Sequence, residues 1–398
     1  MMGKTITLTH DSIDYTWHDV PEKKYQNWKR MSGSSRDLAG FAAPGYPYML
    51  QIEPTSLCNL GCPLCPAGRK ELNRELRHMT LAEFQVIIDD MADYLLFLVM
   101  WDWGEPLLNP DLPAMIRYAS DRGIRTVTST NAHFLTDEKY LTDLLNSGLT
   151  TIIVAIDSLE PEKYEVYRQK GNLNRALRGL RTLIGLKKRC GSPTTINLRM
   201  VVMKQNEGEV ERMRREAKNL GADLFTVKTL NPSCGVTGLD GDMIPDNPAY
   251  RRYEYLPGTY QRIRSPGRCD RIWQMSNIFS NGDVAPCCYD YNAELKTGNI
   301  HAQKFSEIWN GPRYRELRKR LETDKDSVEK CRVCGINYVL SPSGWFVEAT
   351  DFRDPRLVRS RISRTVRTVR SNMLRRGQRV FDILRKVPAR IGKRGQQP

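Results

Sequence analysis

The residues best suited to chemistry are cysteines, and the first set of them lies close together in the sequence. Cys58, Cys62 and Cys65 form the pattern C-x3-C-x2-C directly after an apolar run. Three thiolates can ligate three irons of a [4Fe–4S] cube and leave the fourth iron without a protein ligand. A structural zinc ion would need four ligands, and no nearby Cys or His completes such a set. The spacing therefore favours a reactive iron–sulfur centre.

A second set of cysteines lies further along the chain, with the spacing C-x17-C-C-x42-C-x2-C. Its members are Cys269, Cys287, Cys288, Cys331 and Cys334. Four of them are enough for one fully ligated iron–sulfur cluster or for one zinc ion. We expect Cys190 and Cys234, which belong to neither set, to be ordinary residues.

Strand and helix patterns alternate between residues 48 and 231. Strand-like apolar runs occupy 48–53, 95–101, 124–129, 151–156, 195–203 and 222–229. Helical patterns lie near 80–92, 111–121, 136–147, 173–188 and 207–219, with start signals at Thr80 and Thr136. This alternation predicts an α/β fold with a parallel sheet. Six strands favour a partial (β/α)6 barrel over a closed eightfold one, with its chemistry at the carboxyl ends of the strands.

The segments that follow predict a smaller domain. Residues 232–262 are rich in Gly, Pro and Asp and indicate a linker or a lid. Asn281-Gly282 between two strand-like flanks indicates a hairpin whose turn has positive φ at both central residues. A helix is expected at 304–322. The predicted organisation is an N-terminal extension (1–47), the partial barrel (48–231), the linker or lid (232–262), a β-hairpin and helix domain (263–345) and a basic tail (346–398).

The net charge of +15 resides almost entirely in the tail. Residues 356–398 hold fourteen Lys and Arg and a single acid, Asp382, so the remainder of the chain is nearly neutral. Apolar residues of the tail recur at helical spacing with Arg between them, and Gly377 and Pro388 divide the pattern into two or three pieces. A basic amphipathic helix on an anionic membrane surface is one interpretation. Binding to a nucleic acid or acidic partner and a solvated or domain-covering helix are the alternatives.

The sequence shows no signal peptide and no apolar run long enough to span a bilayer. We therefore expect a cytoplasmic protein, with peripheral contact to the inner face of the membrane if the tail docks there. Thiols stay reduced in the cytoplasm, which favours metal ligation over disulfides.

The spacing of Cys58, Cys62 and Cys65 resembles the signature of the radical S-adenosylmethionine (SAM) superfamily. The resemblance implies that the free iron of a [4Fe–4S] cluster chelates SAM, and that reductive cleavage gives a 5′-deoxyadenosyl radical that abstracts hydrogen from a substrate. It also implies an electron donor of the flavodoxin or ferredoxin type. Leu64 replaces an aromatic residue that is common in the family and still offers adenine an apolar face.

Further residues at the predicted strand ends resemble family motifs for SAM. Trp103-Gly104-Glu105-Pro106 is similar to Gly-Gly-Glu-Pro, in which the backbone and Glu105 would receive the amino group of SAM; a turn that leads into a helix is the alternative. Asn131 would bind ribose or cap a helix. Asp157 and Ser158 begin another family-like run, which continues with Tyr167 and Arg168. Arg199 would bind the carboxylate of SAM or form an ordinary ion pair.

The second cysteine set resembles the SPASM and twitch domains, which hold auxiliary clusters. The pieces "NGDVAPCC", Gly298-Asn299-Ile300 and "EIWN" carry this resemblance. The cysteines are too few for the two clusters of a full SPASM domain, so a single twitch-type [4Fe–4S] cluster is expected. Its expected ligands are Cys269, Cys287, Cys331 and Cys334, with Cys288 as a substitute for Cys287 and zinc as the alternative metal.

The predicted function is oxidation of a hydroxylated small molecule, such as a polyol, an amino sugar or a lipid-linked saccharide. Twitch-bearing dehydrogenases of aminocyclitols have similar cysteine spacing, and their auxiliary cluster accepts the surplus electron. Modification of a ribosomal peptide is the first alternative, although 47 residues before the first strand are short for a leader-binding domain. An epimerase that returns hydrogen from a thiol such as Cys234 is the next alternative. A non-catalytic metal-binding scaffold that acts through the basic tail is the alternative of another class.

Overall fold

The computed structural model describes residues 4–33, 37–232 and 240–354. The predicted amphipathic helix at 356–398 and Cys234 lie outside the described residues. Within these residues no helix is both long and apolar enough to cross a lipid bilayer.

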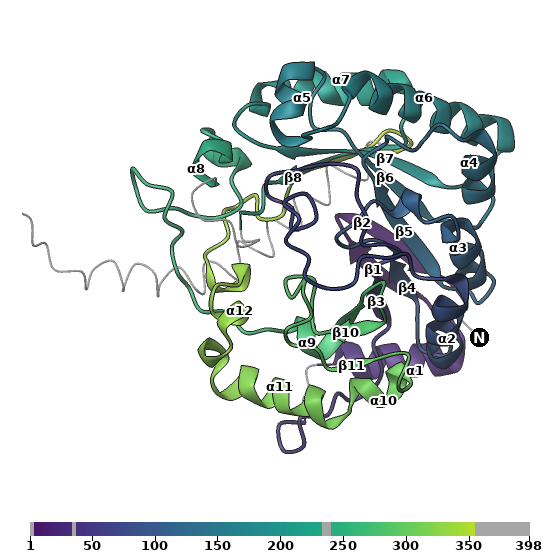
Figure 1. Cartoon of the computed structure of the whole chain (residues 1–398), viewed down its shortest axis with the longest axis vertical. Helices are drawn as coiled ribbons and strands as arrows, with labels where there is room; N and C mark the ends of the chain where they lie inside the picture. The colour runs from purple at the N-terminus through teal and green to yellow at the C-terminus, as the bar shows by residue number, and fades with distance from the viewer. Residues whose placement is uncertain (1–3, 34–36, 233–239, 355–398) are drawn as a thin grey trace, which may run out of the picture.

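Six parallel strands form the body of the sheet and lie side by side in chain order. They are β3 (Met49–Ile52), β4 (Phe97–Val99), β5 (Arg125–Thr130), β6 (Thr151–Ala155), β7 (Thr195–Val202) and β8 (Leu224–Thr229). The helices between them cover the outer face as an arc (Figure 1). They are α2 (Leu81–Met91), α3 (Leu112–Ser120), α4 (Glu138–Leu145), α5 (Pro161–Tyr167), α6 (Leu173–Cys190) and α7 (Val210–Leu220). The predicted α/β class with a partial barrel is confirmed.

Local chemistry explains where the barrel helices begin and end. Thr80 caps α2 with a capping box, because its side chain accepts from the amide of Glu83 while Glu83 accepts from the amide of Thr80. The expected start of α4 at Thr136 is wrong by one residue, since Asp137 accepts from the Tyr140 amide at 3.0 Å and is the N-cap. The short helix α5 was not predicted.

The sheet continues beyond the barrel at both edges. At one edge β9 (Met275–Ile278) pairs parallel with β3, and β10 (Asp283–Ala285) and β11 (Gly298–Asn299) follow antiparallel. At the other edge β12 (Phe346–Asp351) pairs antiparallel with β8. This last strand lies inside the range predicted as tail. Its sequence has no apolar run to mark it, and most of its residues are only half-buried.

The hairpin predicted around Asn281-Gly282 is present, but its turn is of another kind. The Gly282 amide donates to the Phe279 carbonyl at 2.9 Å, and of the two residues only Gly282 has a positive φ, of 80°. Because the Phe279 amide also donates to the Asp283 carbonyl at 2.9 Å, the loop has three residues, 280–282, and ends in a left-handed glycine, whereas the expected loop has two residues.

The N-terminal residues form a second hairpin that was not predicted. Strands β1 (Ile6–His10) and β2 (Ile13–Trp17) lie inside the curve of the sheet, in front of β3 to β6 (Figure 1). Tyr15 packs on Phe97 with ring centroids 4.7 Å apart, and its hydroxyl donates to Thr151 at 3.2 Å. The hairpin therefore fills the interior of the barrel.

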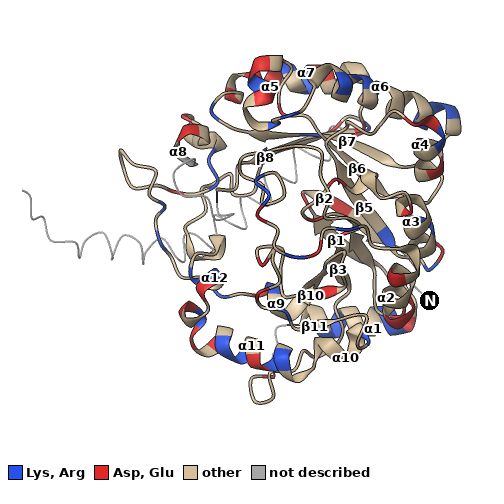
Figure 2. Cartoon of the chain, viewed as in Figure 1, with Lys and Arg blue, Asp and Glu red and all other residues tan. Residues whose placement is uncertain are grey.

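The remaining helical elements lie before β3, within the βα units of the barrel, or in the segments before and after β9 to β11. They are α1 (Glu22–Ser32), η1 (Pro106–Leu108), η2 (Glu207–Glu209), α8 (Asp240–Met243), η3 (Pro248–Tyr250), α9 (Arg271–Gln274), α10 (Phe305–Trp309), α11 (Pro312–Thr323), η4 (Lys325–Ser327), α12 (Glu329–Arg332) and η5 (Gly335–Asn337). The helix predicted at 304–322 is thus two helices, α10 and α11. Acidic and basic residues are interspersed on the outer helices (Figure 2), in line with the nearly neutral body.

Candidate active site

The first cysteine set lies on the loop between β3 and α2, and its three thiols are free. Burial raises the pKa of the Cys58 thiol to about 12 and that of Cys62 to about 11, and the thiols of the set raise one another's pKa further. One buried and two half-buried thiols on one loop fit a cationic iron centre, which would favour the thiolate form that burial opposes.

Two glycines allow the backbone to approach this loop closely. A Cβ at Gly68 would lie 2.4 Å from the Cys62 carbonyl oxygen, and one at Gly104 would lie 2.0 Å from the Thr55 carbonyl oxygen. The Glu105 amide donates to the Leu57 carbonyl at 2.8 Å. The Trp103-Gly104-Glu105-Pro106 motif is therefore packed directly against the segment that leads into Cys58.

Glu105 and Asn131 lie together beside the cysteine loop. The Asn131 amide donates to the Glu105 carboxylate at 2.8 Å, and the Asn131 side chain donates to Asn59, the neighbour of Cys58, at 2.8 Å. Burial raises the pKa of Glu105 to about 7, although backbone donors such as the amide of Asn131 oppose the shift. A buried carboxylate of this kind suits a cationic ligand group.

Arg168 is a residue of this site that the sequence presents only as part of a family-like run. Its Nε donates to Asp157 at 2.6 Å, and its positive charge acts on the Cys62 thiol. Burial would lower the pKa of the guanidinium, but the charges of Asp157 and Cys62 outweigh burial and raise it. The loop after α5 also reaches the cysteines, because the Gly61 amide donates to the Gln169 carbonyl at 2.9 Å.

The other residues predicted to contact SAM have different surroundings. Leu64 is buried with Met203 and Leu230. The Ser158 hydroxyl is fully buried and donates to Glu209 at 2.9 Å. Arg199 forms an ion pair with Asp11, at the tip of the N-terminal hairpin, at 2.6 Å. The structure therefore brings Glu105, Asn131 and Asp157 to the cysteine loop and gives Ser158 and Arg199 other partners.

The second cysteine set is gathered from three segments, namely the loop before α9, the end of β10 and the turn around α12. Its thiols are free, and burial raises the pKa of Cys331 to about 12, with Cys269 and Cys334 adding to the shift. Burial also raises the pKa of Cys287, whose thiol interacts with those of Cys288 and Cys269. In the described part of the chain no three His, Cys, Asp or Glu side chains are arranged to hold a single metal ion. Four thiols from this set are the number that a [4Fe–4S] cluster takes.

Two contacts join the region of the first cysteine set to the region of the second, and neither was expected from the sequence. The Trp103 indole donates to the Cys288 carbonyl at 2.8 Å, so the residue that replaces the family's first glycine touches the second set. Glu53, one residue past β3, accepts two hydrogen bonds from Arg74 and one from the Ser280 hydroxyl at 2.9 Å. The position of Glu53 directly before the Cys58 loop was the signal in the sequence that could have placed it near the site.

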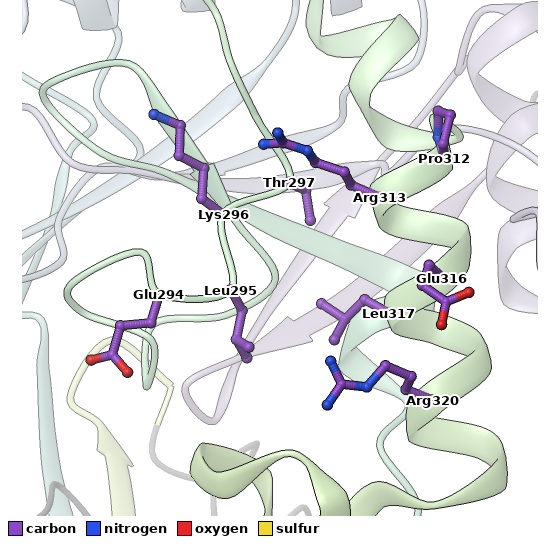
Figure 3. Close-up of a pocket in the computed structure, with 9 residues that line it drawn as sticks. All are labelled: Glu294, Leu295, Lys296, Thr297, Pro312, Arg313, Glu316, Leu317 and Arg320. Carbon is purple, nitrogen blue, oxygen red and sulfur yellow. The ribbon is translucent and has the colours of Figure 1, made fainter.

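The structure also has a surface cavity of about 430 Å³ between residues 294–297 and α11 (Figure 3). Its lining combines Lys296, Arg313 and Arg320 with Glu294 and Glu316, and it contains no cysteine. This cavity is therefore separate from both cysteine sets.

Family comparisons agree with this geometry. Residues 52–217 match the radical SAM superfamily model, and residues 269–335 match the SPASM iron–sulfur cluster-binding domain model. The chain belongs to the radical SAM superfamily and carries a C-terminal SPASM domain. Such domains bind a [4Fe–4S] cluster with SAM and additional iron–sulfur clusters, respectively.

The relatives of this chain act on different substrates. It is 27% identical to an AdoMet-dependent heme synthase of Methanosarcina barkeri over 72% of this chain and 88% of that protein. It is 25% identical to a PqqA peptide cyclase of Granulibacter bethesdensis over 72% of this chain and 79% of that protein. SuiB of Streptococcus suis, solved with its precursor peptide SuiA, shares the fold with a TM-score of 0.53 and 18% identity, over 78% of this chain and 74% of SuiB. The chain is thus a radical SAM enzyme, and these relatives do not determine its reaction.

Proposed function

We propose that this enzyme oxidises a hydroxylated small molecule, with SAM bound at the first cysteine set and a single auxiliary [4Fe–4S] cluster at the second. When bound, the SAM-linked cluster supplies a radical that removes a hydrogen atom, and the auxiliary cluster supplies an acceptor for one electron. Loss of a C–H hydrogen atom, a hydroxyl proton and an electron converts an alcohol to a carbonyl group. A flavodoxin- or ferredoxin-type protein would supply the electron that cleaves SAM.

The observation that carries this proposal is the hydrogen bond of 2.8 Å between the Trp103 indole and the Cys288 carbonyl. It ties the motif that borders the SAM site to the auxiliary thiols, and the parallel pairing of β9 with β3 holds the two regions in one sheet. An auxiliary cluster connected in this way to the SAM site suits a redox step. The proposed ligands of the first cluster are Cys58, Cys62 and Cys65. Those of the second cluster are Cys269, Cys287, Cys331 and Cys334, with Cys288 as the substitute for Cys287.

The surrounding residues would hold SAM by charge and shape. Glu105 would accept the amino group, supported by the Asn131 amide that already donates to it. We assign the carboxylate of SAM to Arg168 rather than Arg199, because Arg168 lies beside Cys62 whereas Arg199 is paired with Asp11. Gly104 provides the close backbone approach, and buried Leu64 provides an apolar surface for adenine.

The test begins with anaerobically reconstituted protein, SAM and dithionite. We expect 5′-deoxyadenosine, about eight irons per chain, and about four irons in the Cys334→Ala variant. The exposed Cys190 provides the matched control, and Cys190→Ala should keep the full iron content. Absence of 5′-deoxyadenosine would refute the proposal.

The choice between substrates is tested with deuterated alcohols. Transfer of deuterium from a polyol or amino sugar into 5′-deoxyadenosine, with formation of a carbonyl product, supports the oxidation. The peptide-cyclase relative makes peptide modification the second candidate, and transfer from a peptide in place of an alcohol would establish it.

A further inference from the structure

The interior of the barrel contains a largely buried group of charged side chains, whose exposed fractions are 6% for Arg199, 15% for Asp11 and 25% for Lys228. Arg199 on β7 donates from Nη1 to the Asp11 carboxylate at 2.6 Å, and Lys228 on β8 lies 3.5 Å from the other oxygen of Asp11. Phe346 on β12 packs against both cations, with the Arg199 guanidinium carbon 5.4 Å and Lys228 Nζ 5.3 Å from its ring centroid. Four elements, namely the N-terminal hairpin, β7, β8 and β12, therefore build this group.

The N-terminal hairpin places Asp11 among these cations at a conformational cost. Asp11 and Ser12 form the tip between β1 and β2, and both have positive φ, of 48° and 63°. A left-handed conformation is unfavourable for a residue other than glycine. The ion pair with Arg199 offsets this cost and fixes the tip of the hairpin in the barrel interior.

The group also has hydrogen-bonding capacity that the protein does not use. Among the described residues, no partner exists for Arg199 Nη2 or for the side-chain nitrogen of Asn197, and both atoms are fully buried. The Arg199 side chain is only 6% exposed, and its Nε donates to the Thr226 hydroxyl, which in turn donates to the side-chain oxygen of Asn197. Both orphaned atoms are donors, so the missing partner must be an acceptor.

Charge points to the same kind of partner. Two cations, Arg199 and Lys228, face one carboxylate, Asp11, which leaves one positive charge uncompensated inside the barrel. Burial lowers the pKa of Lys228, as expected for a cation with too little negative charge around it. An acceptor that carries negative charge would satisfy the free donors and balance the group.

The position of the group suits a substrate. Arg199 is two residues before Val201, whose amide donates to Asp157 at 2.8 Å, and Asp157 in turn binds Arg168 beside Cys62. Two residues along a strand span about 7 Å, so the group lies one layer below the proposed SAM site and deeper in the barrel.

We propose that Arg199 and Lys228, positioned by Asp11, bind an anionic group of the substrate, a carboxylate or a phosphate, in the barrel interior. This inference rests on the proposed function and narrows it, since the hydroxylated substrate then also carries a negative charge.

The test measures anion binding to the anaerobically reconstituted full-length protein by calorimetry. Sodium phosphate and sodium acetate are titrated separately at constant ionic strength. We expect saturable binding of one equivalent of at least one of the two anions. Tighter binding of phosphate identifies a phosphorylated substrate, and tighter binding of acetate identifies a carboxylate.

Three variants locate the binding. Lys228→Gln should weaken it about tenfold, and Arg199→Lys, which keeps a cation beside Asp11 but lacks the free Nη2, should weaken it about fivefold. Lys204, a half-exposed lysine paired with Asp246, provides the matched control, and Lys204→Gln should leave binding unchanged. Arg199→Lys keeps the test decisive if Lys228→Gln fails to fold.

Absence of saturable binding, or equal binding in all variants, would overturn the proposal. Formation of 5′-deoxyadenosine by the wild-type protein is measured on the same preparation. Failure of that reaction with anion binding intact would refute the proposed function while leaving the anion site in place.

Discussion

The two cysteine sets differ in how the chain assembles them. Cys58, Cys62 and Cys65 share one loop, so their spacing in the sequence already predicts their proximity. The second set is drawn from segments on either side of β10 and α11, so its members come together only in the folded chain, where β9 pairs with both β3 and β10. The comparison shows that a reactive centre can be encoded locally, whereas an auxiliary centre depends on the folded sheet.

The largest effect on activity is expected from a substitution in the first cysteine set. Cys62→Ala removes one of the three thiolates that the SAM-binding cluster requires, so formation of 5′-deoxyadenosine should be abolished and about four irons lost. The measurement is product analysis by chromatography together with an iron count. Wild-type product formation in this variant would contradict the assignment of the first set.

A large loss of stability is expected where the two regions are joined. The side chains of Arg74 and Glu53 are 3% and 0% exposed, and Arg74→Met leaves the Glu53 carboxylate buried without its cation. Breaking a buried ion pair costs about 3–5 kcal/mol, which thermal unfolding would detect.

The matched control for this variant is an exposed ion pair. Lys139 and Asp143 are paired on the surface of α4, with side chains 88% and 54% exposed. Lys139→Met should leave the melting temperature unchanged. An equal change in melting temperature for Arg74→Met and Lys139→Met would contradict the role of Glu53 in joining the regions of the two cysteine sets.

The N-terminal hairpin predicts a dependence of stability on pH. Burial lowers the pKa of His10 from 6.5 to about 4, and Lys228, Arg199 and Arg271 add to the shift. The unfolded chain therefore binds a proton between these pH values that the folded chain does not. The resulting stability is full above pH 6.5 and is lost as the pH falls to about 4, by at most about 3 kcal/mol.

His10→Gln tests this dependence, because glutamine does not titrate. Melting temperatures at pH 7.5 and pH 5 should differ less in the variant than in the wild type. An unchanged difference would show that His10 does not control the acid sensitivity.

The smallest effect is expected from the contact between the two sets. Trp103→Phe removes the hydrogen bond to the Cys288 carbonyl and should cost about 1 kcal/mol of stability. It should also change the reduction potential of the auxiliary cluster more than that of the SAM-binding cluster. Trp345→Phe, at an indole 45% exposed, is the control and should change neither potential.

Much of the barrel could be predicted from sequence, because its elements carry strong local signals. The buried strands β3 to β8 read as apolar runs, and Thr80 begins α2 with a capping box. The N-terminal hairpin carries a weaker signal of alternating Thr and apolar residues in short strands. Strand β12 has no apolar run, and it is stabilised by pairing with β8 and by the ion pair of Glu348 with Arg214.

The residues of the site also divide into those that the sequence could place and those that only the fold brings together. Glu105 and Asn131 could be placed by the strands that precede them. The partner of Arg199 could not, because Asp11 lies 188 residues away and reaches it only through the packing of the hairpin. Arg168 was visible in the sequence, but its approach to Cys62 depends on the turn after α5.

Electron paramagnetic resonance of the reduced protein, with and without SAM, distinguishes the two proposed clusters. We expect two [4Fe–4S] signals, of which one changes when SAM is added and is lost in Cys62→Ala, while the other is lost in Cys334→Ala. Zinc in place of iron, or spectra that SAM leaves unchanged, would contradict this expectation.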